Sequence, residues 1–360
     1  MKLGIFGLPQ SGKTAVFRVL AGRGDAAARD THGEAQAAVV KLPDERLDFI
    51  AQVFHSKKAT PAEITFIDTV ALHRGRADAK RAESLTALLG DADAFALVVR
   101  CFDLAGDDPG NAAREDGESL LLELALTDLA ILQRRVDRLE RDLRQGKKEV
   151  AAEHELLTRC TAHLEAEGLL ARLQLTAEEE KALRGFALLT MKPMLVVANV
   201  GEEDAGADVL SPGGKLAPLA AKCAELGLPA MAFCAELEAE IQELDPEEQA
   251  AFRADYGIQE PARDAFVRAC FDLLDLVTFF TANENEARAW NIAAGSTALD
   301  AAGKVHTDMA RGFIRAEVIA FEDLQAAGSV AECRHRGTAR LEGREHPIRD
   351  GDILQIRFSV

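Results

Sequence analysis

Short apolar runs recur along residues 1–275, and longer segments with helical spacing separate them. An apolar run of this kind is typical of a strand that is buried on both faces. Strands that alternate with helices indicate a parallel sheet with crossover helices, so the pattern predicts an α/β fold. The predicted strands are residues 2–6, 63–67, 94–99, 194–198 and 230–233, and the first predicted helix is 14–21.

Residues 120–175 carry a different pattern, in which apolar positions follow one another at alternating spacings of three and four. This is the narrow stripe of a coiled-coil seam. The polar stretch 145–148 interrupts the stripe, and a second helical run follows it. An antiparallel helical hairpin, inserted between strands of the sheet, is the simplest structure for two such stripes. The seam residues are Leu122, Ala125, Leu129, Leu132, Val136, Leu139 and Leu143.

Residues 276–360 predict a small α+β module with short strands around tight turns. Its predicted strands are 278–281, 287–292, 340–341, 346–348 and 353–358, and its predicted helix is 313–320. The predicted domains are 1–117 and 189–275, which are two parts of one domain, the insertion 118–188, and the module 276–360.

Composition excludes several functional classes. The formal net charge is −18, so the chain as a whole repels nucleic acid, and no DNA sequence specificity is expected. No apolar run approaches the about 20 residues that span a bilayer, so no membrane association is expected. None of the six cysteines forms a CxxC pair, which favours reduced thiols and a cytoplasmic location.

The most basic stretch of the chain lies on the first helix of the predicted hairpin and in the turn after it. Two interpretations remain open. Its cations form a solvated helix face paired with Asp137, Glu140 and Asp142, or they form a contact surface for RNA or an acidic partner. The basic residues are Arg134, Arg135, Arg138, Arg141, Arg144, Lys147 and Lys148.

The strongest chemical signal is GLPQSGKT at residues 7–14, which fits GxxxxGK followed by Thr and lies between a predicted strand and a predicted helix. In this context backbone N–H groups of the loop cradle a β-phosphate. Lys13 is the catalytic cation that reaches the β- and γ-phosphates, and the Thr14 hydroxyl is a Mg²⁺ ligand. The predicted phosphate-binding residues are Gly7, Pro9, Gln10, Ser11, Gly12, Lys13, Thr14 and Ala15.

Asp68 ends the predicted strand 63–67 and is the second predicted Mg²⁺ ligand, because a carboxylate at such a strand end can hold the ion. Residues 68–71, DTVA, occupy the place of the DxxG of GTPases. Leu72 follows where many GTPases place a Gln that orients the attacking water, and a leucine side chain cannot do this. Leu72 is therefore assigned to the catalytic set, and slow intrinsic hydrolysis is expected.

Residues 199–202, NVGE, follow the strand 194–198 where GTPases carry NKxD. The usual Asp accepts hydrogen bonds from guanine N1–H and N2–H₂, whereas Glu202 is one methylene longer and cannot take the same geometry. Asn199 can bond N7, which both purines carry, and Val200 leaves an apolar contact in place of the usual Lys. ATP is therefore expected to be accepted beside GTP. Cys234, Ala235 and Glu236 resemble the loop that closes on the base.

The chain resembles the Obg-like ATPase family, the YchF proteins of the translation-factor class, over essentially its whole length. The resemblance rests on GLPQSGKT, on Asn199 with Glu202, on LPDERLD at 42–48 and on RCF at 100–102. Its most specific part is the C-terminus, where 306–323 and 341–358 resemble the TGS domain, a ubiquitin-like β-grasp module.

This resemblance implies a P-loop NTPase of the Ras-like G-domain type, with an inserted antiparallel helical hairpin and a C-terminal β-grasp (TGS) domain. It implies Mg²⁺-dependent hydrolysis of ATP or GTP, with a hydrophobic residue in place of the catalytic Gln. It also implies association with the ribosome or ribosomal RNA, and the hairpin and the TGS module frame a cleft proposed to bind nucleic acid.

Two departures from the family pattern leave a second function open. Ala71 stands where the family usually has Gly, and residues 103–118 contain no His where the family has one that is implicated in hydrolysis. The leading prediction is a slow NTPase that acts as a ribosome-associated switch. The alternative is a non-hydrolysing nucleotide-binding scaffold with a nucleic-acid- or ribosome-contacting cleft.

Overall fold

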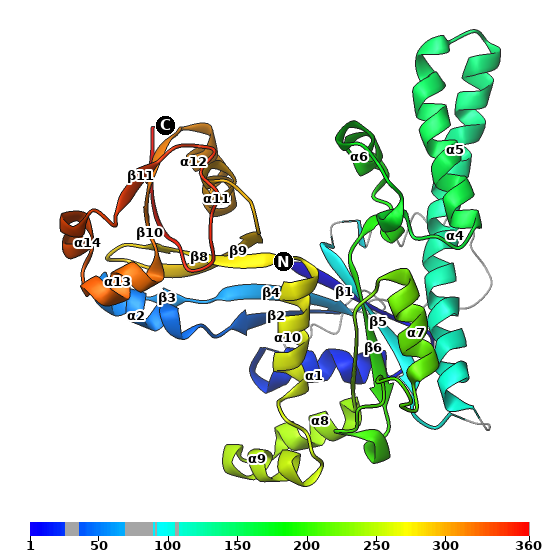
Figure 1. Cartoon of the computed structure of the whole chain (residues 1–360), viewed down its shortest axis with the longest axis horizontal. Coiled ribbons are helices and arrows are strands. Elements are labelled where there is room, and N and C mark those ends of the chain that lie inside the picture. The colour runs from blue at the N-terminus through cyan, green and yellow to red at the C-terminus, as the bar shows by residue number, and fades with distance from the viewer. Residues whose placement is uncertain (26–35, 69–88, 91, 105–107, 360) are drawn as a thin grey trace. The chain divides into compact units, whose positions relative to one another are not determined.

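The computed structural model describes residues 1–25, 36–68, 89–90, 92–104 and 108–359 (Figure 1). The chain divides into two compact units. The larger unit comprises Lys2–Val39 and Thr65–Ala269, and the smaller unit comprises Met1, Val40–Ile64 and Cys270–Val360. Among the helices within the described ranges, none combines the length and the apolar character that crossing a bilayer requires.

The larger unit is built on a six-stranded sheet in the order β2-β4-β1-β5-β6-β7. β1 pairs in parallel with β4 and β5, and β6 pairs in parallel with β5 and β7, so the predicted parallel α/β sheet is confirmed. The strands are β1 (Lys2–Gly7), β2 (Gln36–Leu42), β4 (Ala62–Asp68), β5 (Ala94–Cys101), β6 (Met194–Val200) and β7 (Ala230–Phe233). β2 was not predicted from the sequence.

Helices pack on both faces of this sheet. On one face Phe6 shares a buried cluster with Leu124 of α4 and Leu219 of α7, and on the other Phe66 meets Phe266 of α10 with ring centroids 5.7 Å apart. The helices of the larger unit are α1 (Lys13–Asp25), α4 (Pro109–Arg144), α5 (Ala151–Glu165), α6 (Ala177–Leu183), α7 (Ala217–Leu226), α8 (Ala235–Glu243), α9 (Pro246–Asp255) and α10 (Ala262–Leu273).

α4 and α5 lie side by side as the predicted hairpin, and their apolar side chains share one core (Figure 1). The predicted seam is right from Ala125 to Leu139, but Leu143 is not part of the shared core, and Leu122 is wrong because its side chain is 52% exposed. The reason is that the first half of α4 packs on the sheet through Leu120 and Leu124, so its buried stripe there has a different phase. Arg135 pairs with Glu153 of α5 at 2.7 Å.

The smaller unit contains a second six-stranded sheet, in the order β11-β10-β12-β8-β9-β3. α11 packs against it through Ala298, Ala301 and Ala302. The strands are β3 (Ala59–Thr60), β8 (Leu276–Ala282), β9 (Ala287–Ala293), β10 (Phe313–Ile319), β11 (Arg340–Glu342) and β12 (Ile353–Phe358). The helices are α2 (Glu45–Val53), α11 (Ala298–Val305), α12 (Thr307–Arg311), α13 (Phe321–Ala327) and α14 (Val330–Arg336).

Residues Val40–Ile64, which the sequence places in the first part of the P-loop domain, belong to the smaller unit. β3 pairs in parallel with β9 and so extends the second sheet. Arg46 of α2 bonds Asp350 at 2.6 Å and lies over the ring of Phe280 at 5.2 Å from its centroid. The connection between β2 and β4 of the first sheet therefore supplies α2 and β3 to the fold of the C-terminal module.

Two local predictions for the C-terminal module are wrong. Residues 313–320, expected to be helical, contain strand β10. A register shift between Phe313 and Arg315 puts Phe313 and Ala316 into the same core, and this spacing of three imitates a helix. Residues 346–348 form no strand and contribute only an isolated bridge between Pro347 and Thr297.

A buried carboxylate attaches the hairpin to the rest of the larger unit. Asp128 of α4 accepts hydrogen bonds from the N–H groups of Leu189 and Thr190, both at 2.8 Å, and from the Thr190 hydroxyl at 2.6 Å. Burial raises the pKa of Asp128 to about 6, so the group is ionised at neutral pH and is stabilised there by all three donors.

Replacing Asp128 by Ala should lower the free energy of unfolding by about 3 kcal/mol, because two buried N–H groups lose their acceptor. Urea unfolding measures this change. Asp137→Ala on the exposed face of α4 is the matched control and should change stability by less than about 0.5 kcal/mol. Equal losses in the two variants would contradict the anchoring role of Asp128.

Candidate nucleotide site

The loop between β1 and α1 has the backbone shape of a phosphate cradle. β1 ends at Gly7 and α1 begins at Lys13, and the chain turns between them with the N–H of Ser11 bonded to the C=O of Leu8 at 3.2 Å. Gly12 has φ +78°, in the left-handed region that favours glycine. The Ser11 hydroxyl is buried and has no hydrogen-bond partner among the described residues, so it remains available as a donor.

Lys13, Thr14 and Asp68 meet beside this loop. The register of β1 on β4 pairs Ile5 with Asp68, which brings the carboxylate to the start of α1. Lys13 Nζ donates to Asp68 Oδ1, and Thr14 Oγ1 donates to Asp68 Oδ2 at 3.4 Å. The two predicted metal ligands are thus neighbours, although the part of the chain that the structure describes holds no cluster of three or more His, Cys, Asp or Glu side chains.

Asn199 joins the phosphate loop to the loop after β7. Its side chain is buried at 4% exposure, Nδ2 donates to the C=O of Ser11 at 3.1 Å, and Oδ1 accepts from the N–H of Ala235 at 3.1 Å. The absence of a side chain at Gly12 leaves room for this amide. Both polar atoms of Asn199 therefore bond backbone groups of the two loops that the sequence assigned to nucleotide.

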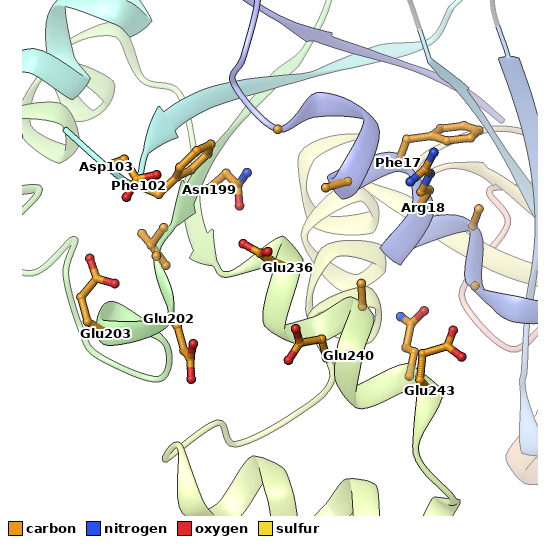
Figure 2. Close-up of a pocket in the computed structure, with 18 of the residues that line it drawn as sticks. Phe17, Arg18, Phe102, Asp103, Asn199, Glu202, Glu203, Glu236, Glu240 and Glu243 are labelled. Carbon is orange, nitrogen blue, oxygen red and sulfur yellow. The ribbon is translucent and has the colours of Figure 1, made fainter.

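Cys234 begins α8 as its N-cap, with Sγ accepting from the N–H of Leu237 at 3.4 Å. Burial raises the pKa of the Cys234 thiol, so it remains neutral at physiological pH and acts as a weak cap rather than a nucleophile. The cap places Glu236 at the start of the helix, where its side chain faces a cleft (Figure 2).

This cleft has a volume of about 1080 Å³ and is the nucleotide-sized cavity beside the phosphate loop. Of the residues predicted to bind nucleotide, its lining includes Gly12, Ala15, Asn199, Val200, Glu202 and Glu236. Its further lining residues, which the sequence did not predict, are Phe17, Arg18, Ala21, Gly22, Gln36, Phe102, Asp103, Gly201, Glu203, Ala239, Glu240, Gln242 and Glu243.

Known proteins with similar sequences were found for the whole chain. The chain is 36% identical over 369 residues to "Ribosome-binding ATPase YchF" of Escherichia coli O157:H7, which covers 100% of this chain and 99% of that protein. It is 34% identical over 370 residues to the protein of the same name from Bacillus subtilis (strain 168), covering 99% of each. It belongs to the YchF family. The family model YchF-GTPase_C, described as a protein of unknown function (DUF933), matches residues 276–359.

Solved structures support the fold of this YchF protein. The Schizosaccharomyces pombe YchF GTPase superposes with a TM-score of 0.79 at 24% identity, covering 99% of this chain and 97% of that chain. The GTP binding protein from Pyrococcus horikoshii OT3 superposes with a TM-score of 0.61 at 19% identity, covering 100% of both chains. The P-loop NTPase fold class predicted from the sequence is therefore confirmed.

Phe102 and Asp103 are the unpredicted cleft residues that a sequence signal could have found. They follow the end of β5, and ligands of parallel α/β sheets bind beyond the carboxyl ends of the strands. Arg100 holds this segment by donating from Nε to the C=O of Phe102 at 3.1 Å. The Phe102 ring lies beside Gly12 of the phosphate loop.

The cleft of this YchF protein is strongly acidic away from the phosphate loop (Figure 2). Arg18 is the single Lys or Arg among the described residues that line it. A triphosphate is repelled by such a wall and attracted by Lys13 and the helix N-terminus, so the charges orient a nucleotide with its phosphates at the loop. The acidic lining residues are Asp103, Glu202, Glu203, Glu236, Glu240 and Glu243.

The remaining predicted site residues divide into two groups. The catalytic candidate Leu72 and the variant residue Ala71 lie outside the described residues. The others lie in the phosphate loop or at the adjoining ends of β1, α1, β4 and α8 but do not line the cleft, and they are Gly7, Pro9, Gln10, Ser11, Lys13, Thr14, Asp68, Cys234 and Ala235.

Gly12→Ala should weaken nucleotide binding by more than about tenfold, because a Cβ at this position would collide with Nδ2 of Asn199. Binding of a fluorescent ATP analogue measures the effect. Gly146→Ala is the matched control, since Gly146 has φ +87° and no atom within 4 Å of an added Cβ. If both variants bind as tightly as the parent, the phosphate loop does not carry the affinity.

Proposed function

We propose that the protein is a Mg²⁺-dependent ATP- or GTP-binding protein, a slow NTPase that acts as a ribosome-associated switch in the cytoplasm. The observation that carries the proposal is the junction of Lys13, Thr14 and Asp68 beside a glycine-containing loop at a helix N-terminus. Its relatives, named ribosome-binding ATPases, support the same reading.

The phosphates would bind at the loop through backbone N–H groups and the N-terminus of α1. Lys13 would leave Asp68 and pair with the β- and γ-phosphates, which carry more negative charge than one carboxylate. Thr14 and Asp68 would hold Mg²⁺, which neutralises phosphate charge when bound. Since Mg²⁺ keeps several waters and takes few protein ligands, one hydroxyl and one carboxylate fit this ion.

The base and ribose would occupy the acidic part of the cleft. The buried amide of Asn199 bonds both the phosphate loop and the segment that begins at Ala235. It would therefore fix the two chain segments on either side of the base. Val200 offers an apolar contact, and the Glu202 side chain lies at the edge. None of these groups excludes adenine, which favours a protein that accepts ATP as well as GTP.

Slow hydrolysis is proposed from Leu72 at the position of a water-orienting Gln, with Lys13 as the cation that stabilises charge on the phosphates. The non-hydrolysing scaffold remains the second candidate, because Ala71 and the lack of His in residues 103–118 both remove groups that turnover would use.

The proposed partner is the ribosome or ribosomal RNA. The net charge of −18 opposes nonspecific binding to nucleic acid, so contact would depend on a local basic surface. On the hairpin, Arg144 pairs with Glu140 at 3.0 Å and Lys147 with Asp142 at 2.7 Å, so part of its positive charge is already matched. No DNA sequence specificity and no membrane partner are proposed.

Lys13→Ala should weaken binding of both ATP and GTP by more than about a hundredfold, because the triphosphate loses its cation. Isothermal titration in the presence of Mg²⁺ measures both affinities. Lys181→Ala, an exposed lysine on α6, is the matched control and should bind as the parent does. Affinity that survives in Lys13→Ala would show that the site lies elsewhere.

Phosphate release under single-turnover conditions separates the two candidate functions. With protein in excess over ATP, a slow release that depends on Mg²⁺ and disappears in Lys13→Ala is expected, because Leu72 leaves the attacking water unoriented. Release equal to the protein-free blank, at saturating binding, would favour the scaffold and exclude the NTPase.

A further inference from the structure

Glu202 is held by a phenol that lies outside the cleft. Tyr256 donates from its hydroxyl to Glu202 Oε1. Glu202 lines the cleft at its exposed edge, and Figure 2 shows its carboxylate directed away from the side chain of Asn199. The carboxylate at the position of the guanine-reading Asp thus points away from Asn199.

Packing contacts with neighbouring residues fix the position of Tyr256. It follows α9, where its ring stacks on Phe252 with centroids 5.4 Å apart and planes at 30°. Gly206, at φ +73°, passes so close to the C=O of Tyr256 that an added Cβ would collide with it. The segment that carries Glu202 is therefore pressed against the residue that holds it.

A second contact stiffens the segment of Glu202. Lys215 bonds Asp204 and lies 3.7 Å from Glu203, so the turn that follows Glu202 is fixed on its other side. With the Asp204 side chain bonded to Lys215 and the backbone of Gly206 against Tyr256, the direction of the Glu202 side chain depends mainly on what its carboxylate bonds. The described structure gives it one side-chain donor, the Tyr256 hydroxyl.

We propose that Tyr256 determines base specificity by holding the Glu202 carboxylate away from the purine, so that guanine is not read. The inference rests on the proposed function, because it assumes that the purine lies in this cleft. Guanine offers two donors, N1–H and N2–H₂, to a carboxylate at its edge, and adenine offers neither. A side chain as long as Glu must fold back to meet that edge, and the bond to Tyr256 holds the carboxylate outward instead.

The hydrogen bond can be tested without nucleotide, because Tyr256 is the single tyrosine of the chain. Its bond to Glu202 raises the pKa of the phenol above the ordinary value of 10.0, with smaller contributions from the charges of Glu240 and Asp255. Ultraviolet titration of the phenolate should show a raised pKa in the parent protein and a lower one in Glu202→Ala. An unchanged pKa in that variant would overturn the contact.

The effect on specificity is tested by competition of ATP and GTP against a fluorescent ATP analogue. Tyr256→Phe keeps the ring stacked on Phe252 and removes only the hydroxyl. It should increase GTP affinity roughly fivefold and leave ATP affinity within about twofold, as expected for the net contribution of one exposed hydrogen bond. In the Glu202→Ala background, Tyr256→Phe should no longer change the ratio of the two affinities.

The outcomes separate this inference from the proposed function. If the parent protein binds neither nucleotide, the proposed function fails and the inference fails with it. If the parent binds but Tyr256→Phe leaves the GTP-to-ATP ratio unchanged, only the inference is overturned. A change of the same size in the Glu202→Ala background would also overturn it, because the effect would not pass through Glu202.

Discussion

The candidate site depends on one buried amide. Asn199 bonds the C=O of Ser11 and the N–H of Ala235, so a single side chain on β6 holds together two loops that are far apart in the sequence. A buried amide that lost either partner would leave a backbone group unsatisfied, which makes the arrangement costly to break. Gly12 is required for the same reason, since only a residue without a side chain leaves space for the amide.

Charge then divides the cleft into two ends. At the phosphate end Lys13 pairs with Asp68, and both side chains are largely buried. The other end carries six carboxylates, and this difference in charge would orient a triphosphate with its phosphates toward Lys13. In the proposed binding mode, selection between purines would be left to weak contacts at the edge of the cleft, where Glu202 lies and is bonded by Tyr256.

The phosphate loop could be predicted because its residues are contiguous and its chemistry is local to one strand, one turn and one helix. Asp68 could also be predicted as a site residue, because the carboxyl ends of parallel strands lie at one edge of the sheet. The contact of Asn199 with Ser11 and the placement of Glu240 or Tyr256 could not be predicted, since they depend on how distant elements pack. Residues 313–320 were wrongly predicted to be helical because the bulge after Phe313 changes the spacing of buried residues along the strand.

The base of the hairpin is attached through charged side chains that bond backbone groups. Lys192, close to the Thr190 that bonds Asp128, donates to the C=O groups of Leu89 at 2.9 Å and of Gly90 and Ala92 at 2.6 Å. These carbonyls lie just before β5, which begins at Ala94. Asp128 and Lys192 thus link α4 to the backbone of Leu89, Gly90 and Ala92, so moving the base of α4 would break several charged hydrogen bonds.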